Sequence, residues 1–248
     1  MFLVRLKNFE PFFHATSRLA LIAREADVKF TPLFFSITVS NQFPRFVAYL
    51  VMTYNCFINY KVDNDHTSRI SLESFHDALL DGGGSPSMTI HLLANINQMI
   101  LRFESSSHAP QVRHELSLKP SQEEDLGEID YAKFFSIDSK ALRRVIRNLP
   151  IFHGDSICVT ATRSQVKFSI ASKEIVLTKE NEECIIVGYE GEEETKMGIN
   201  LNPMLFFLNF THDTLRVWFY KTTTYHGAMV VPSFGFYSQY VILFPNYN

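Results

Sequence analysis

The chain has 248 residues, of which 46% are hydrophobic and 20% charged, a composition typical of one large globular domain or two of about half that size. Ten glycines and ten prolines exclude collagen-like and low-complexity classes. The net charge of −3 predicts no preference for nucleic acid, so only the distribution of charge can indicate one. Twenty-three phenylalanines and ten tyrosines against one tryptophan indicate many strands or an extensive core.

Alternation and aromatic or β-branched enrichment predict strands throughout the chain. In chain order they are 2–6, 28–30, 34–39, 46–52, 57–62, 88–93, 100–104, 112–118, 132–137, 157–162, 166–170, 175–178, 184–189, 196–201, 215–220, 228–231 and 237–244. The order is that of an antiparallel meander and not of a βαβ series. A polar, acidic segment at 119–130 separates the two halves.

Helical spacing of apolar residues occurs in four places, at 9–23, 72–80, 139–149 and from Pro203 onward. Asp138 is the predicted N-cap of the third helix, and Asn202 is the predicted N-cap of the fourth, with Pro203 at its first position. The four starts are 63, 67 and 64 residues apart. This spacing predicts a strand-helix-strands unit that occurs four times, twice in each half, although coincidence is the alternative.

Catalytic and metal-binding motifs are weak. Three cysteines, Cys56, Cys158 and Cys184, form no C-x-x-C pair, so reduced thiols of an intracellular protein are predicted. The glycine run 82–84 lacks the Lys-Ser/Thr of a phosphate loop, and 63–65 begins like a calcium loop but lacks its later ligands. No apolar run has signal-peptide or membrane-helix length. We expect no enzyme, no catalytic residue, no metal, no cofactor and no membrane partner.

Positive charge gathers on the third helix. Lys140, Arg143, Arg144 and Arg147 lie at i, i+3, i+4 and i+7, opposite the apolar face. Because neighbouring like charges destabilise a helix, the clustering suggests a surface for phosphates that follows a nucleic-acid backbone without reading bases. An ordinary solvated face is the alternative.

Several short motifs, in order along the whole chain, resemble DNA sliding clamps of the proliferating cell nuclear antigen family. They are Met1-Phe2-x-x-Arg5-Leu6, Phe57-x-x-Tyr60, Ser117-Leu118 through Asp125-Leu126-Gly127 to Tyr131, Val166-Lys167-Phe168-Ser169, Leu208-Asn209-Phe210 and Leu243-Phe244-Pro245. The resemblance implies an α+β fold with two similar clamp domains at 1–118 and 131–248, joined by a connector at 119–130. It also implies a trimeric ring around duplex DNA, nuclear if the source is a eukaryote, with antiparallel sheets outside and two helices per domain lining the pore.

The same resemblance assigns DNA contacts to Arg144 and Arg147, and this chain adds Arg143 on the same helix. We expect Lys140 of the same stripe to contact DNA as well, with Arg18 and Arg24 as the nearest cations of the first helix. The lining departs from the family elsewhere. Glu73, Asp77 and Asp81 form an acidic stripe on the second helix, and the fourth helix is almost entirely apolar.

Two further surfaces follow from the resemblance. Polymerases and other replication or repair proteins are expected to dock at Val47, Leu126, Gly127, Ile129, Leu243, Phe244 and Pro245. Lys119, Ser121 and Glu123 replace apolar residues there, so less apolar area is expected for client peptides. Subunit contacts are expected along the edge strands, at Val112, His114, Leu116, Ile175 and Leu177, although these are alternatively plain edges guarded by charged residues.

Three functional hypotheses remain open. The first is a divergent, non-catalytic sliding clamp that self-associates as a trimer. The second is one subunit of a heterotrimeric checkpoint-type clamp, whose partners supply the missing pore charge. The third is a clamp-shaped interaction protein that no longer holds DNA. The apolar fourth helix and the acidic stripe favour the second and third hypotheses, whereas the cations of the third helix favour the first and second.

Overall fold

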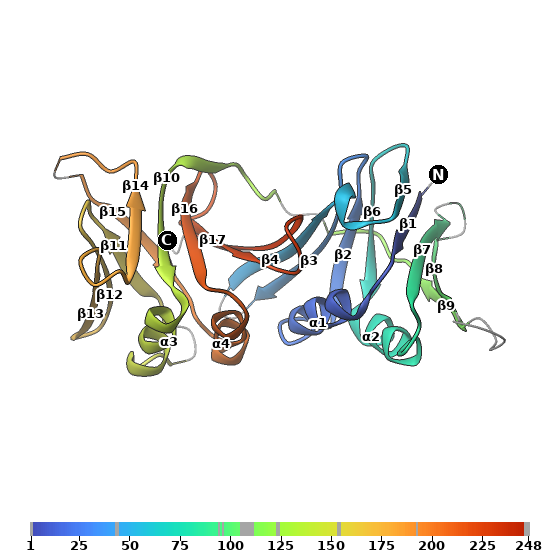
Figure 1. The fold of residues 1–248 in the computed structure, drawn as a ribbon, viewed down its shortest axis with the longest axis horizontal. Coiled ribbons are helices and arrows are strands. Elements are labelled where there is room, and N and C mark those ends of the chain that lie inside the picture. Colours follow the sequence, from blue (N-terminus) through green and yellow to red (C-terminus); the bar gives the residue numbers. More distant parts are fainter. Residues whose placement is uncertain are drawn as a thin grey trace. The chain divides into compact units, whose positions relative to one another are not determined.

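The computed structural model describes the chain apart from residues 1, 43–44, 94, 96, 105–111, 123–124, 153–154, 192 and 246–248. The fold is α+β, with antiparallel sheets and four short α-helices, each of ten residues (Figure 1). The chain divides into two compact units, which are described separately. Unit 1 comprises Met1–Ser40, Tyr49–Glu124 and Ser233–Gln239, and unit 2 comprises Asn41–Ala48, Asp125–Pro232 and Tyr240–Asn248.

Unit 1 contains two helices and two sets of neighbouring strands. One set has the order β5-β1-β7-β8-β9, and the other has the order β6-β2-β3-β4. The elements are β1 (Phe2–Leu6), α1 (Glu10–Leu19), β2 (Glu25–Phe30), β3 (Phe34–Gln42), β4 (Arg45–Thr53), a 3₁₀ turn (Tyr54–Cys56), β5 (Asn59–Val62), β6 (His66–Ser71), α2 (Leu72–Asp81), β7 (Ser87–Leu93), β8 (Gln98–Glu104) and β9 (Val112–Ser117).

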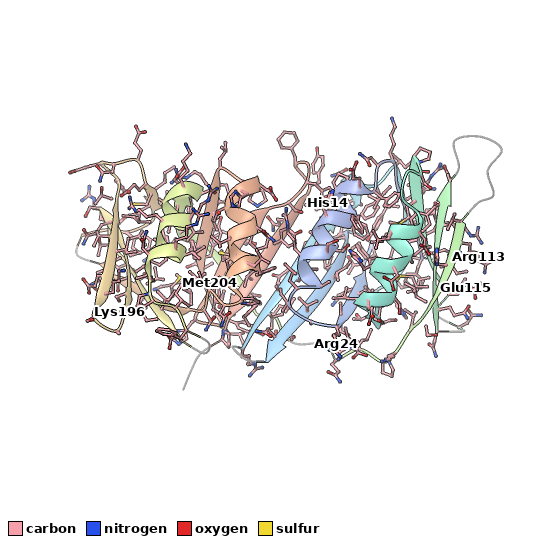
Figure 2. All side chains as sticks on the ribbon, turned by 90° about the horizontal axis from the view of Figure 1, so that it is seen from below. His14, Arg24, Arg113, Glu115, Lys196 and Met204 are labelled. Atoms are coloured by element: carbon pink, nitrogen blue, oxygen red, sulfur yellow. The ribbon has the colours of Figure 1, made fainter. Side chains whose placement is uncertain are left out.

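Unit 2 has a similar composition, with strand orders β14-β10-β16-β17-β18 and β13-β12-β11-β15. The elements are β10 (Ile129–Asp138), α3 (Ser139–Asn148), β11 (Ile157–Ala161), β12 (Gln165–Ile170), β13 (Lys173–Thr178), β14 (Cys184–Val187), β15 (Thr195–Ile199), α4 (Met204–Asp213), β16 (Arg216–Thr222), β17 (Gly227–Pro232) and β18 (Ser238–Phe244). Figure 2 shows α3 and α4 side by side, with Met204 at the start of α4.

Phenylalanine builds the core of each unit. In unit 1, the Phe12 ring meets Phe75 edge-on at 6.0 Å, and Phe30 packs on Phe35 at 4.8 Å. In unit 2, Phe210 packs against both Phe206 and Tyr240 at 4.8 Å. All of these rings are almost fully buried, which accounts for much of the high aromatic content.

The predicted elements are found with bounds that agree to within three residues, apart from three larger differences. Helix α1 ends at Leu19 and not near 23, because the next amides bond three residues back, Leu21 to Arg18 and Ile22 to Leu19. Strand β6 extends over His66–Ser71 and pairs with β2, whereas no strand range was predicted here beyond the strand that precedes each helix of the repeated unit.

The third difference is at the start of α4. Asn202 is not the N-cap, because Pro203 occupies that position and the Asn202 amide donates to the Asn200 side chain at 2.8 Å. Within the described residues, no helix is both long and apolar enough to cross a membrane.

Candidate nucleic-acid interface

Helix α3 is fixed at its start by Asp138. The Asp138 carboxylate accepts hydrogen bonds from the amides of Lys140 at 2.9 Å and Ala141 at 3.1 Å, as its sequence position predicted. The helix buries Ala141, Leu142, Val145 and Ile146 against the unit, and the cations project from the other side. The four predicted cations therefore share a helix, but their side chains have three different environments.

Arg143 is tied to the neighbouring helix. Its guanidinium donates to the Thr211 hydroxyl at 3.1 Å and to the Thr211 carbonyl at 2.6 Å, near the end of α4. The side chain is half-buried, and Thr211 is buried. Arg143 is thus a structural link between α3 and α4 in addition to a source of positive charge.

Arg144 is paired with an acid. Its guanidinium donates to the Glu183 carboxylate at 2.6 Å, and the side chains are 49% and 15% exposed, respectively. The other Glu183 oxygen accepts from the Thr178 amide at 3.2 Å, and the Glu183 carbonyl accepts from the Asp138 amide at 2.9 Å. The carboxylate is therefore held in place by the backbone, and it offsets part of the positive field at Arg144.

Lys140 and Arg147 are the freely presented cations of α3. Both are exposed, and neither side chain has a hydrogen bond or ion pair with any residue that the structure describes. They lie seven residues apart, two turns along one face. Two unpaired cations at this separation can each contact a phosphate without breaking an existing ion pair.

The predicted cations of the first helix are less favourable. Arg18 is half-buried in α1 and already has a partner. Arg24 is exposed, but it lines a surface cavity of about 620 Å³ together with Glu73 and Asp77 of α2. The two carboxylates reduce the attraction of this region for phosphate.

Helices α2 and α4 add no lysine or arginine to the helical surfaces. Glu73, Asp77 and Asp81 of α2 are all exposed, and α4 exposes Leu205 and ends at His212 and Asp213. Positive charge is therefore concentrated on α3, while the acidic stripe that the sequence predicted on α2 faces solvent.

The predicted client-docking residues separate into two groups. Val47, Leu243 and Phe244 are at most 1% exposed, and Pro245 is also buried, so these four belong to the core of unit 2. Leu126, Gly127 and Ile129 are half-buried, and the Tyr225 hydroxyl holds this segment by donating to the Asp125 carbonyl at 3.1 Å. Ser121 is half-buried and Lys119 exposed, whereas Glu123 lies outside the described residues.

The predicted contact strands are both at sheet ends. Strand β9 pairs only with β8, and β13 only with β12, among the described residues, so each has one open backbone edge. The named side chains point inward: Leu116 and Leu177 are buried, and Val112, His114 and Ile175 are half-buried. Figure 2 shows Arg113 and Glu115 on β9, where they form an ion pair of 2.5 Å.

Two residues of this region were not predicted from the sequence. In the sequence, Glu183 is one of many acids at 180–194, and no pattern marks Thr211. The roles of both residues arise from contacts with α3, which is distant from them along the chain. The described residues contain no group of three or more His, Cys, Asp or Glu side chains that could hold a metal ion. In comparisons with known proteins, no family model matches the chain, and no curated protein matches it.

Proposed function

We propose that the chain is a non-catalytic subunit of a DNA sliding clamp, a ring that encircles duplex DNA and carries replication or repair proteins along it. The observation that carries the proposal is the unpaired pair of cations Lys140 and Arg147 on the solvent face of α3. A closed ring needs only weak, non-specific attraction to phosphates, since strong contacts would prevent sliding.

Three further features support this proposal. Each unit combines two short helices with antiparallel sheets, and the motifs that resemble the nuclear antigen family extend over nearly the whole chain. The open edges of β9 and β13 are suited to strand pairing between subunits. In a eukaryote, such a protein acts in the nucleus.

A heteromeric ring is the second candidate, and the charge of the helices favours it. Helix α2 carries three acids and no Lys or Arg, and α4 ends in an acid. A ring made of three identical chains repeats these acids three times, whereas partner subunits with basic helices compensate for them.

Light scattering on the purified chain separates the candidates. A particle of three times the 28.6 kDa chain mass supports the homotrimer, and a monomer at micromolar concentration contradicts it in favour of the heteromer. DNA binding is tested in parallel by fluorescence anisotropy with a labelled duplex at low salt. The variant Lys140→Glu/Arg147→Glu is expected to lose binding.

The matched control is Lys61→Glu/Arg163→Glu, which changes the net charge equally at exposed positions away from α3. It is expected to retain most of the binding. Equal losses in the two variants would show that total charge, and not the surface of α3, governs attraction to DNA.

A further inference from the structure

One sheet face of unit 2 is apolar where an antiparallel sheet ordinarily presents polar side chains to water. Across β14, β10 and β16, directly opposed residues form two rows. One row is Val187, Phe134 and Tyr220, and the other is Ile185, Ser136 and Trp218. Directly opposed residues project to the same side of a sheet. We call Phe134, Ile185, Val187, Trp218 and Tyr220 the apolar shelf; its three strands are neighbours in Figure 1.

The shelf faces solvent and not the core. Ile185 is 47% exposed and Val187 is 41% exposed, and Phe134, Trp218 and Tyr220 are half-buried. The intervening residues on the opposite side of the same strands are buried: Phe135, Ile137, Cys184, Ile186, Val217 and Phe219. On the shelf side, Ser136 of β10 and Ala228 and Val230 of β17 are buried as well, so the shelf is the part of this face that keeps exposed apolar surface.

Aromatic packing extends the shelf at one end. Tyr131 is 62% exposed, and its ring meets Tyr220 edge-on at 5.2 Å; the Phe134 ring lies 5.6 Å from Tyr220. Burial beside these rings raises the pKa of the Tyr220 hydroxyl. At the other end, Arg216 folds over Ser136, donating to its hydroxyl and its carbonyl at 3.0 Å each.

The other sheets serve as an internal comparison. Across β1, β7, β8 and β9, one row of the outward face consists of Arg5, Thr89, Arg102 and Arg113. On β11, β12 and β15, Thr160 aligns with Lys167 and Lys196. These rows carry the polar residues expected of a solvated face, so the shelf is not a general property of the fold.

We propose that the apolar shelf binds a short segment of a partner protein that presents two or three aliphatic or aromatic side chains next to lysine or arginine. The small area of the apolar shelf favours a short segment as its occupant. Three strands about 4.8 Å apart, each contributing two positions about 6.8 Å apart, give a footprint of roughly 200 Å². A stable dimer buries about 800 Å² on each partner, so a second copy of the chain is not the occupant.

Charge near the shelf selects a basic flank for that segment. The stretch 180–194, which includes β14, contains seven glutamates and no lysine or arginine. Glu183, Glu193 and Glu194 pair with Arg144, Lys133 and Lys196, respectively. Glu190, three residues beyond Val187, is exposed and has no ion pair among the described residues. A cationic flank is therefore attracted to the end of the shelf where the chain leaves β14.

Trp218 is the only tryptophan of the chain and lies in the shelf, so its fluorescence reports occupancy without a label. The probe is a ten-residue, tryptophan-free peptide with the core Leu-Phe-Leu-Ile preceded by Lys-Arg-Lys. We expect a saturable blue shift of the emission. Replacing the flank by Asp-Glu-Asp weakens binding at least tenfold, and replacing the core by serines abolishes the shift.

The variant Ile185→Lys is expected to weaken binding of the basic peptide at least tenfold, and Val187→Lys provides a second variant should the first fail to fold. The matched control is Leu205→Lys on α4, where an aliphatic side chain is 59% exposed outside the shelf. No saturable shift up to millimolar peptide, or equal binding by Ile185→Lys and Leu205→Lys, overturns the proposal. An emission change with protein concentration alone, accompanied by dimers in light scattering, also overturns it in favour of a second copy.

Discussion

The guanidinium of Arg144 and the carboxylate of Glu183 form a hydrogen-bonded ion pair of 2.6 Å, with Glu183 itself largely buried. A salt bridge with one buried partner is costly to break without replacement, so a phosphate has to compete with Glu183 for Arg144. In the proposed contact with DNA, the availability of Arg144 thus depends on a residue that does not lie on α3.

We predict that Arg144→Ala leaves the salt dependence of DNA binding almost unchanged, whereas Arg147→Ala lowers the slope of log K against log salt by about 0.9, the value for one phosphate contact. Glu183→Gln is expected to raise the slope by a similar amount, and Glu183→Gln/Arg144→Ala to remove that gain. Anisotropy titrations at several salt concentrations provide the slopes. A decrease of about 0.9 in the slope of Arg144→Ala alone would mean that Arg144 leaves Glu183 to contact DNA.

Arg143 is expected to matter more for stability than for DNA binding. In Arg143→Ala, the Thr211 carbonyl loses its charged donor, and we predict a loss of about 1–3 kcal/mol in the free energy of unfolding. Arg143→Lys keeps the charge but cannot donate to both Thr211 oxygens in the same geometry, so we expect its loss of stability to be smaller than that of Arg143→Ala. Urea denaturation measures both variants. A neutral effect of Arg143→Ala would indicate that water replaces the guanidinium.

Stability is predicted to fall as the pH decreases from about 7 to 5. Burial lowers the pKa of His66, and burial together with the charge of Arg102 lowers the pKa of His91. The unfolded chain therefore takes up protons near the ordinary histidine pKa of about 6.5, before the folded chain does. The contribution of His66 and His91 to the free energy of unfolding is complete above this ordinary histidine pKa and is lost as the pH falls below it.

Urea midpoints at pH 7.5, 6.5 and 5.5 test this linkage. The variant His66→Gln/His91→Gln is expected to lose less stability over this range than the parent, and His14→Gln, at an exposed position, serves as the control. Glu25 and Glu193 have a pKa lowered chiefly by hydrogen bonds from Lys119 and Lys133, so their losses occur at still lower pH. An identical pH dependence in the double variant would refute the histidine assignment.

Gly188 and Gly191 form a matched pair for backbone strain beside the apolar shelf. Both have positive φ, +83° and +57°, but an added Cβ at Gly188 lies 2.5 Å from the Ala132 carbonyl oxygen, whereas at Gly191 it meets nothing within 4 Å. Gly188→Ala is therefore expected to cost about 1–3 kcal/mol more than Gly191→Ala in chemical denaturation. Equal costs would show that the chain shifts to accommodate the methyl group at little expense.

Much of the fold could be predicted from local patterns. Strand 2–6 and the start of α3 agree with the structure because alternation and an N-cap aspartate are local signals. The extent of α1 and the cap of α4 could not be predicted, since they depend on i to i−3 bonds and on the Asn200 side chain. The sequence pattern also predicted correctly which helix carries most of the positive charge. Spacing alone, however, gave no reason to expect different environments for its four cations.

The differences among those cations arise from tertiary contacts. Glu183 is 39 residues from Arg144 along the chain, and Thr211 is 68 residues from Arg143, so no pattern on α3 indicates either contact. The buried state of Val47 and Leu243 likewise follows from packing within unit 2 and not from hydropathy alone. The clamp family, the domain bounds and the docking roles of these residues stay predictions.

The bond from Arg143 to Thr211 has a consequence for helix α4. This helix has no lysine or arginine of its own, and its last carbonyls form the negative end of its dipole. Arg143 supplies a cation to that end from the neighbouring helix. Although its Cα belongs to α3, its charge serves as the electrostatic C-cap of α4, so the most apolar helix of the chain ends stably without a cation of its own.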